Sequence, residues 1–256
     1  MAGAAAADVW RGDEGRVAGM KQARGFKVKL ALYAFMLLGA NLALAQFSTP
    51  AEGEYVISDG ASGTLRVQPR GKFAIETKGA NAHVCDLDGV IVDGKSRIGK
   101  SACQVSFKTE GQDVKVSTNG ADACRDFCGM RAWFEGTYRK PEPLCVRKSI
   151  NESKKNFKKS YVAKDYAAAL AVIQPVATQC KSFLHWIESA WVLNDLALTQ
   201  FKLGDRAACI KTLQGLAPDA AKSDDEIKGS YPPSDSDAYL PVVQATRTNL
   251  RLCTKK

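Results

Sequence analysis

Cys103-Gln104-Val105-Ser106-Phe107 and, after a glycine-containing turn, Val114-Lys115-Val116 alternate apolar and polar residues with a period of two. This period is typical of strands with one buried face, and it recurs in short runs between residues 54 and 139. The other runs are 55–57, 64–67, 73–75, 90–92 and 133–134. Asp59-Gly60, Asp88-Gly89, Asp93-Gly94 and Asn119-Gly120 are turn dipeptides between them. The region therefore predicts a small antiparallel barrel or sandwich.

The pattern changes near Pro141-Glu142-Pro143, after which glycine becomes rare and alanine and leucine recur at helical spacing. This half contains an internal repeat. The segment 164–177 (KDYAAALAVIQPVA) aligns with 204–217 (GDRAACIKTLQGLA) at an offset of 40 residues, and five positions are identical. We expect a helix in each copy, ended by Pro175 or Gly215. Pro218 predicts a stop, the acidic segment 219–237 predicts a loop, and 240–252 predicts a last helix.

The spacing of small and apolar residues in these two copies resembles the second helix of a tetratricopeptide-type hairpin, and 194–205 is similar to the matching first helix and turn. The resemblance covers roughly residues 150 to 220 and implies a helical domain that binds a protein or peptide in its groove. The sequence thus predicts an α+β chain of two domains. The β-domain covers 46–140, and the tetratricopeptide-like helical domain covers 141–256.

Residues 20–45 have the layout of a secretory signal peptide. Lys21, Arg24, Lys27 and Lys29 precede an apolar run at 30–40, and Ala43-Leu44-Ala45 supplies the small residues of a cleavage site. We expect cleavage after Ala45 and a periplasmic or secreted protein with no stable membrane span. Residues 1–19 are rich in alanine and glycine and precede a suitable start at Met20, so we interpret them as an overextended, disordered start.

Eight cysteines lie beyond the predicted signal peptide, which in an exported chain predicts a disulfide framework. They are Cys85, Cys103, Cys124, Cys128, Cys145, Cys180, Cys209 and Cys253. Their distribution predicts pairing within each half. In the helical half we expect Cys145 with Cys180 and Cys209 with Cys253. In the first half, Cys85 with Cys103 and Cys124 with Cys128 are the pairings considered.

The charge of the chain is only mildly basic. Of 36 basic and 27 acidic residues, 6 and 3 precede Gln46, which leaves a net charge of +6 on the expected mature chain. Lys154, Lys155, Lys158 and Lys159 form the densest positive run. They are either an ordinary solvated helix face or a contact for an anionic envelope polymer, lipid head group or acidic protein. Nucleic acid is not an expected partner in that compartment.

Two motifs match enzyme signatures without their usual context. Gly94-Lys95-Ser96-Arg97-Ile98-Gly99-Lys100-Ser101 fits the phosphate-binding loop, but a strand pattern follows it where a helix is needed, so we expect a hairpin. Cys85-Asp86-Leu87-Asp88-Gly89 resembles the first motif of haloacid-dehalogenase-type phosphatases, which implies an Asp86 nucleophile and an Asp88 acid and base. Asp224-Asp225 is the acidic pair available for magnesium there, and turn formation is the alternative reading of the motif.

Other candidate sites are weaker. Cys124 and Cys128 are separated by three residues, which favours a structural disulfide over a redox site. His83 and His185 lie in different halves, so no histidine-rich zinc site is expected, and we expect His185 beside Trp186 to line a helix interface. The sequence predicts no cofactor and no metal.

The β-half, including 79–85 and 124–138, resembles a small disulfide-bonded β-domain of bacterial envelope proteins, some of them related to lysozyme inhibitors. The four-cysteine helical motif of the lysozyme-inhibitor module itself is not recognisable in this chain. The sequence therefore predicts an exported, non-enzymatic envelope factor that binds an unknown protein or peptide. The alternatives are an exported phosphohydrolase that uses Asp86 and Asp88, and a lysozyme-protective envelope protein.

Overall fold

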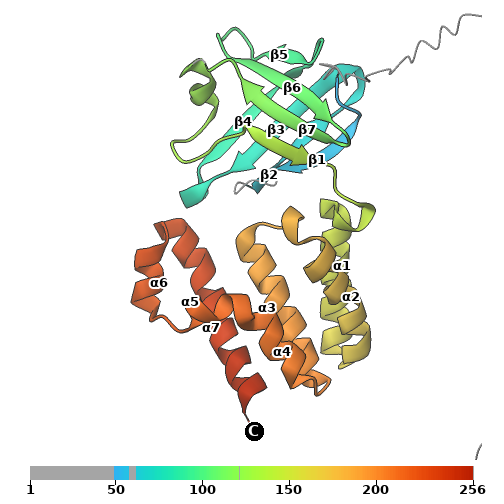
Figure 1. Ribbon diagram of the computed structural model, residues 1–256, viewed down its shortest axis with the longest axis vertical. Helices are drawn as coiled ribbons and strands as arrows, with labels where there is room; N and C mark the ends of the chain where they lie inside the picture. The colour runs from blue at the N-terminus through green and yellow to red at the C-terminus, as the bar shows by residue number, and fades with distance from the viewer. Residues whose placement is uncertain (1–48, 58–61, 121, 256) are drawn as a thin grey trace, which may run out of the picture. The chain divides into compact units, whose positions relative to one another are not determined.

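The computed structural model describes residues 49–57, 62–120 and 122–255. The predicted signal peptide, its cleavage site after Ala45, the start at 1–19 and the Asp59-Gly60 turn lie outside the described residues. An eight-stranded antiparallel sheet curls into a nearly closed barrel and is followed by a helical region, as Figure 1 shows. The α+β class and the two-part organisation predicted from the sequence are thus confirmed.

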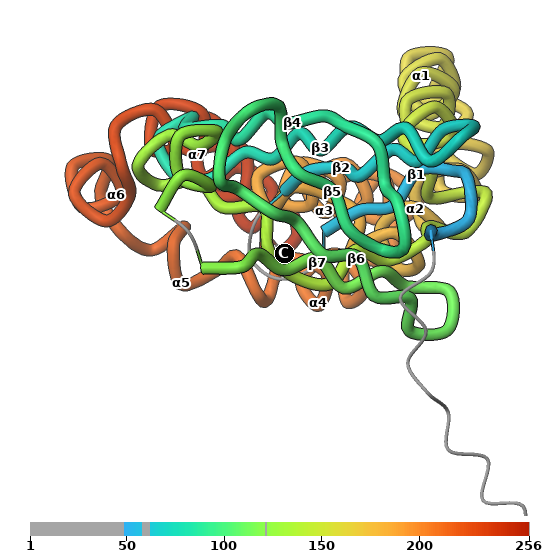
Figure 2. Tube along the Cα trace, turned by 90° about the horizontal axis from the view of Figure 1, so that it is seen from above, coloured from blue at the N-terminus to red at the C-terminus, as the bar shows by residue number. Residues whose placement is uncertain are grey.

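The strands follow one another around the sheet in the order β4-β3-β2-β1-β8-β7-β6-β5, and every pairing is antiparallel. Their bounds are β1 (Gly53–Ile57), β2 (Ser62–Val67), β3 (Lys72–Lys78), β4 (Val84–Val90), β5 (Lys95–Arg97), β6 (Gln104–Glu110), β7 (Asp113–Thr118) and β8 (Gly136–Arg139). Seen from above in Figure 2, the trace of the sheet curves back on itself.

Large apolar side chains from alternating positions fill the barrel. Phe73 and Phe107 meet edge to face with their ring centroids 4.8 Å apart, and Tyr138 is fully buried. The Tyr138 hydroxyl donates a hydrogen bond to the Phe134 carbonyl oxygen at 2.8 Å, and burial raises the pKa of this phenol. The alternating pattern recognised in the sequence therefore places its apolar side chains inside a packed core.

Three predicted elements of the β-half are wrong. Of the predicted strand 90–92, only Val90 lies in a strand, as the last residue of β4. Asp88-Gly89 is not a turn, because β4 continues through it, with Cys85 and Leu87 inward and Gly89 opposite Phe73 on β3. Trp133 and Phe134 are not a strand; β8 begins two residues later, where Tyr138 pairs with Val114. The Asp93-Gly94 turn is confirmed. Both of its residues have positive φ angles, 49° and 71°.

The disulfides keep to their own halves, as predicted, but the pairings considered for the first half are wrong. Cys85 is bonded to Cys128 and Cys103 to Cys124. Cys85 lies on β4, which pairs with β3, whereas Cys103 precedes β6, which lies between β5 and β7. The two bonds therefore tie one 3-10 segment, Asp122–Phe127, and the residue after it to two separate parts of the barrel.

The helices are α1 (Arg147–Val162), α2 (Tyr166–Gln179), α3 (Trp186–Lys202), α4 (Arg206–Leu213), α5 (Ala217–Ala220), α6 (Asp224–Ser230) and α7 (Pro233–Thr254). The pairs α1–α2 and α3–α4 form two helical hairpins, and α7 packs against α3 and α4 (Figure 1). Disulfides join Cys145 to Cys180 and Cys209 to Cys253, the two pairings predicted for this half.

The sequence repeat corresponds to two equivalent helix starts. The Asp165 carboxylate accepts a hydrogen bond from the Ala168 amide at 3.0 Å, and Asp205 accepts one from the Ala208 amide at 2.9 Å. The first repeated helix ends later than predicted, because α2 runs through Pro175 to Gln179, whereas α4 ends at Leu213, just before Gly215. Burial of Val176 and Ala177 and the disulfide at Cys180 hold the last turn of α2 in place.

The segment 219–237, predicted as a loop, forms α5, α6 and the first turn of α7. Its polar residues are used for local bonding. Ser223 and Glu226 form a reciprocal capping box at the start of α6. The Asp219 carboxylate accepts hydrogen bonds from the hydroxyls of Tyr231 at 2.8 Å and Tyr239 at 3.1 Å. Pro218 lies in the first turn of α5, and the second repeat helix, α4, has already ended at Leu213.

Candidate functional site

The enzyme motifs of the β-half lie in ordinary barrel structure. Asp86 and Asp88 point outward from β4, an antiparallel strand at one end of the sheet order. The phosphate-loop match forms β5 and a turn into β6, as the expected hairpin does, so no helix follows it to hold a phosphate. Within the described residues, no group of three or more histidine, cysteine or acidic side chains is arranged to hold a metal ion.

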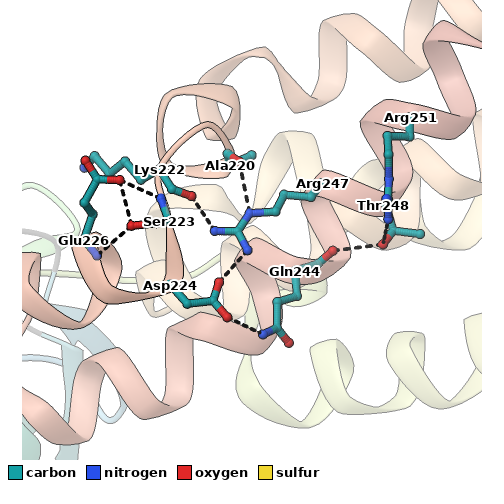
Figure 3. Close-up of polar contacts among 9 residues, drawn as sticks. All are labelled: Ala220, Lys222, Ser223, Asp224, Glu226, Gln244, Arg247, Thr248 and Arg251. Atoms are coloured by element: carbon teal, nitrogen blue, oxygen red, sulfur yellow. Dashed lines mark hydrogen bonds and ion pairs between the residues drawn. The ribbon is translucent and has the colours of Figure 1, made fainter.

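Of the two aspartates considered for magnesium, Asp224 is bonded to other residues of the helical region and Asp225 is exposed. Arg247 on α7 donates to the Asp224 carboxylate and also to the carbonyl oxygens of Ala220 and Lys222, as Figure 3 shows. The hydrogen bond from Arg247, followed by that from Gln244, lowers the pKa of Asp224. This carboxylate therefore fastens α6 to α7, and no contact between described residues joins it to Asp86 or Asp88.

The lysine run on α1 is divided by the fold. Lys154 pairs with Glu188 on α3 at 2.9 Å, and Arg147 pairs with the same carboxylate at 2.8 Å. Lys155, Lys158 and Lys159 are exposed on α1. Lys154 therefore connects two helices, and only the other three lysines present the solvated basic face that the sequence suggested.

A cavity lies between β1, β2 and the start of α3, within a single compact unit of the chain. Its volume is about 570 Å³, and His185 and Trp186 line it, as expected for a residue pair at an interface. Burial and the nearby Lys78 lower the pKa of His185, and the ring stands 5.7 Å from the Trp186 ring. No hydrogen bond to the His185 ring is formed among the described residues, and the nearby carboxylates of Asp235 and Glu188 act to raise the pKa of His185, against the larger effects.

A second cavity, of about 370 Å³, is open on the face where α3 meets α7. Trp191, Asp195 and Leu198 line it from α3, and they fall on one face because their spacing is four and three residues. Gln244 and Thr248 line it from α7. Trp191 is 38% exposed, so part of this large apolar side chain faces solvent.

A third cavity, of about 630 Å³, adjoins this one and shares Gln244 and Thr248 with it. Arg251 lines its far side, and its guanidinium donates to the Thr248 hydroxyl at 3.2 Å. Figure 3 shows Gln244, Thr248 and Arg251 following one another along α7, while Arg247 reaches across to the loop before α6. The two cavities thus share the Gln244 and Thr248 side chains of α7, and we call the surface that they line the α3–α7 face.

Buried amides hold the two helices of this face in register. Asn249 donates to the Asn194 side-chain oxygen at 2.9 Å, and Asn194 donates to the Thr246 hydroxyl at 2.9 Å. Asn194 and Asn249 are 3% and 6% exposed, so their hydrogen bonds have no competition from water. This network fixes the position of α7 beside Trp191 and Asp195.

Asp195 is the electrostatically unusual group of the face. Burial raises the pKa of Asp195 to about 6, while Lys154 on α1 acts in the opposite direction. No described side chain donates a hydrogen bond to its carboxylate. A carboxylate that is partly desolvated and unpaired is costly in a folded protein, and perturbed carboxylates are enriched at functional sites.

Sequence reasoning missed every residue of this face. The segment 194–205 was assigned to a helix, but a helical pattern does not distinguish a tryptophan at an open surface from one in a core. The spacing of Trp191, Asp195 and Leu198 places them on one side of a helix and was the available indication. Their pairing with α7 depends on contacts across about 50 residues of chain, between Asn194 and Asn249.

Comparison of the chain with protein-family models, with curated proteins and with solved structures finds no match. The four disulfides indicate that the protein matures in an oxidising, extracytoplasmic compartment. Among the described helices, none is long and apolar enough to cross a membrane.

Proposed function

We propose that this chain is an exported, non-enzymatic protein whose tetratricopeptide-like helical domain binds a segment of a partner protein along the α3–α7 face. The observation that carries the proposal is the pair of adjoining cavities beside an exposed Trp191. Exposed aromatic side chains in grooves are frequent anchors of protein recognition. Two helical hairpins followed by a further helix are also a common scaffold for peptide grooves.

The chemistry of the face supports binding more than catalysis. Its central polar groups are the side chains of Gln244 and Thr248, which can donate to and accept from a peptide backbone. No described nucleophile or base is hydrogen-bonded to the Asp195 carboxylate, and we propose a binding role for this group. An extended peptide then lies beside α7, from the cavity that Asp195 lines on α3 to the cavity that Arg251 lines on α7.

The test uses the full chain, expressed with its own leader and purified from the oxidising compartment. Twelve-residue peptides from a random displayed library are selected on this protein, and the affinity of each is measured by calorimetry. We expect Trp191→Ala and Thr248→Arg to weaken the selected peptides at least tenfold, because one removes the anchor and the other fills the shared part of both cavities.

The matched control is Trp133→Ala in the β-half, because Trp133 is 41% exposed and Trp191 is 38% exposed. It should leave the affinities unchanged. The proposal fails if no peptide is enriched, or if Trp191→Ala and Thr248→Arg bind the selected peptides as well as the unchanged protein does. Circular dichroism on each variant establishes that the helices are intact.

A further inference from the structure

The partner segment can be defined more closely from the surroundings of Asp195, and this step depends on the proposed function. Asp195 lies one helical turn from Trp191, and both side chains line the cavity of about 370 Å³. Leu198, one turn further along α3, lines it as well. A carboxylate, an indole ring and an aliphatic side chain thus meet on one side of an open cavity.

The charges around Asp195 leave its own charge without a direct partner. From α1, Lys154 lowers the pKa of Asp195, but its ammonium group is paired with Glu188 at 2.9 Å. Tyr161, also on α1, is near enough for Asp195 to raise its pKa. From α7, the cavity receives the uncharged side chains of Gln244, Thr248 and Asn249. No described cation forms an ion pair with the Asp195 carboxylate.

This combination is complementary to a cation on a long apolar stem. A guanidinium or ammonium group can form charge-assisted hydrogen bonds with a carboxylate, and its stem or its charge can lie against an indole ring. An anionic group is repelled by Asp195, and a purely apolar group leaves the carboxylate desolvated without compensation. We infer that the partner segment inserts a lysine or arginine side chain between Trp191 and Asp195.

The decisive experiment is a double-mutant cycle. The probe is the tightest peptide from the library selection, compared with the same peptide in which each basic residue in turn is replaced by glutamine. Both are measured on the unchanged protein and on the Asp195→Asn variant. We expect one peptide replacement and Asp195→Asn each to weaken binding about tenfold, and the two changes together to weaken it little more than either alone.

Asp88→Asn is the matched control, since Asp88 is an exposed aspartate on the barrel, and it should not alter binding. Selected peptides that need Trp191 but contain no basic residue, or whose basic residues show no coupling to Asp195, overturn the inference and leave the proposed function standing. Peptides that bind independently of Trp191 and Thr248 overturn the proposed function instead.

Discussion

At the scale of single residues, Asp195 is the side chain whose environment is least favourable to its charge. It lies in the middle of α3, away from the helix start where a carboxylate is stabilised, and burial raises its pKa to about 6. The ordinary value is 3.8, so the folded protein holds this proton more tightly than the unfolded chain does. The ionised Asp195 side chain therefore lowers the stability of the folded protein at neutral pH. Residues that bind a partner often lower stability in this way.

Replacing Asp195 by asparagine should therefore stabilise the protein at neutral pH. The contribution of Asp195 to stability is most favourable below about pH 4 and becomes less favourable as the pH rises through about 6. We expect Asp195→Asn to raise the free energy of unfolding at pH 7 by roughly 1 to 3 kcal/mol, and to change it little near pH 4. Urea unfolding at both pH values measures this, with Asp88→Asn as control. Equal effects at the two pH values would contradict the electrostatic explanation.

The amide network beneath the face gives a second prediction at this scale. Asn249→Ala removes the donor to the buried Asn194 side-chain oxygen, which then loses this hydrogen-bond partner. We expect a loss of about 1 to 3 kcal/mol in the free energy of unfolding. Thr248→Ala, one residue away and exposed, should change stability by less than about 0.5 kcal/mol. Equal losses of unfolding free energy in both variants would contradict a stabilising role of the buried amide network.

At the scale of elements, the helical region uses one local device twice. Asp165 and Asp205 cap α2 and α4 in the same way, and the residues before them, Lys164 and Gly204, both have positive φ angles of 61° and 85°. Lysine at such a position is strained relative to glycine, which adopts it freely. The first copy of the repeat therefore has the less favourable turn.

Lys164→Gly should stabilise the first hairpin for that reason. We expect the free energy of unfolding to rise by up to about 1 kcal/mol, with the gain partly offset by the greater freedom of glycine in the unfolded chain. Gly204→Lys is the reciprocal change and should destabilise the protein by a similar amount or more. Thermal unfolding of the two variants measures both effects. A destabilised Lys164→Gly protein would mean that the lysine side chain contributes packing that outweighs the backbone strain.

At the scale of the whole molecule, four disulfides hold the β-half and the helical half as separately closed frameworks. The bonded cysteines are 43, 21, 35 and 44 residues apart in the sequence. No bond between described cysteines links the two halves. Loops of this size are typically worth roughly 2 to 4 kcal/mol each through restriction of the unfolded chain. Both halves thus depend on an oxidising compartment for their stability.

A non-reducing peptide map of protein from its native host, with free thiols blocked, tests this organisation. We expect four linked peptide pairs, two in each half, and Gln46 at the amino terminus if the predicted signal peptide is removed. Blocked free cysteines or a link between Cys124 and Cys128 would contradict the arrangement. Retention of residues 1–45 would remove the export prediction and return the phosphohydrolase alternative to consideration.

Features that depend on neighbours along the chain could be predicted from the sequence. The period-two runs of β2, β3, β6 and β7, the Asp93-Gly94 turn and the two cysteine pairs of the helical half are of this kind. Which distant segments meet was settled by the tertiary structure alone. It placed β4 where the DxDG motif suggested a turn, bonded Cys85 to Cys128, ordered the acidic segment through Asp219 and Arg247, and opened a cavity beside Asp195. Each of these depends on partners far along the chain, which spacing in the sequence does not specify.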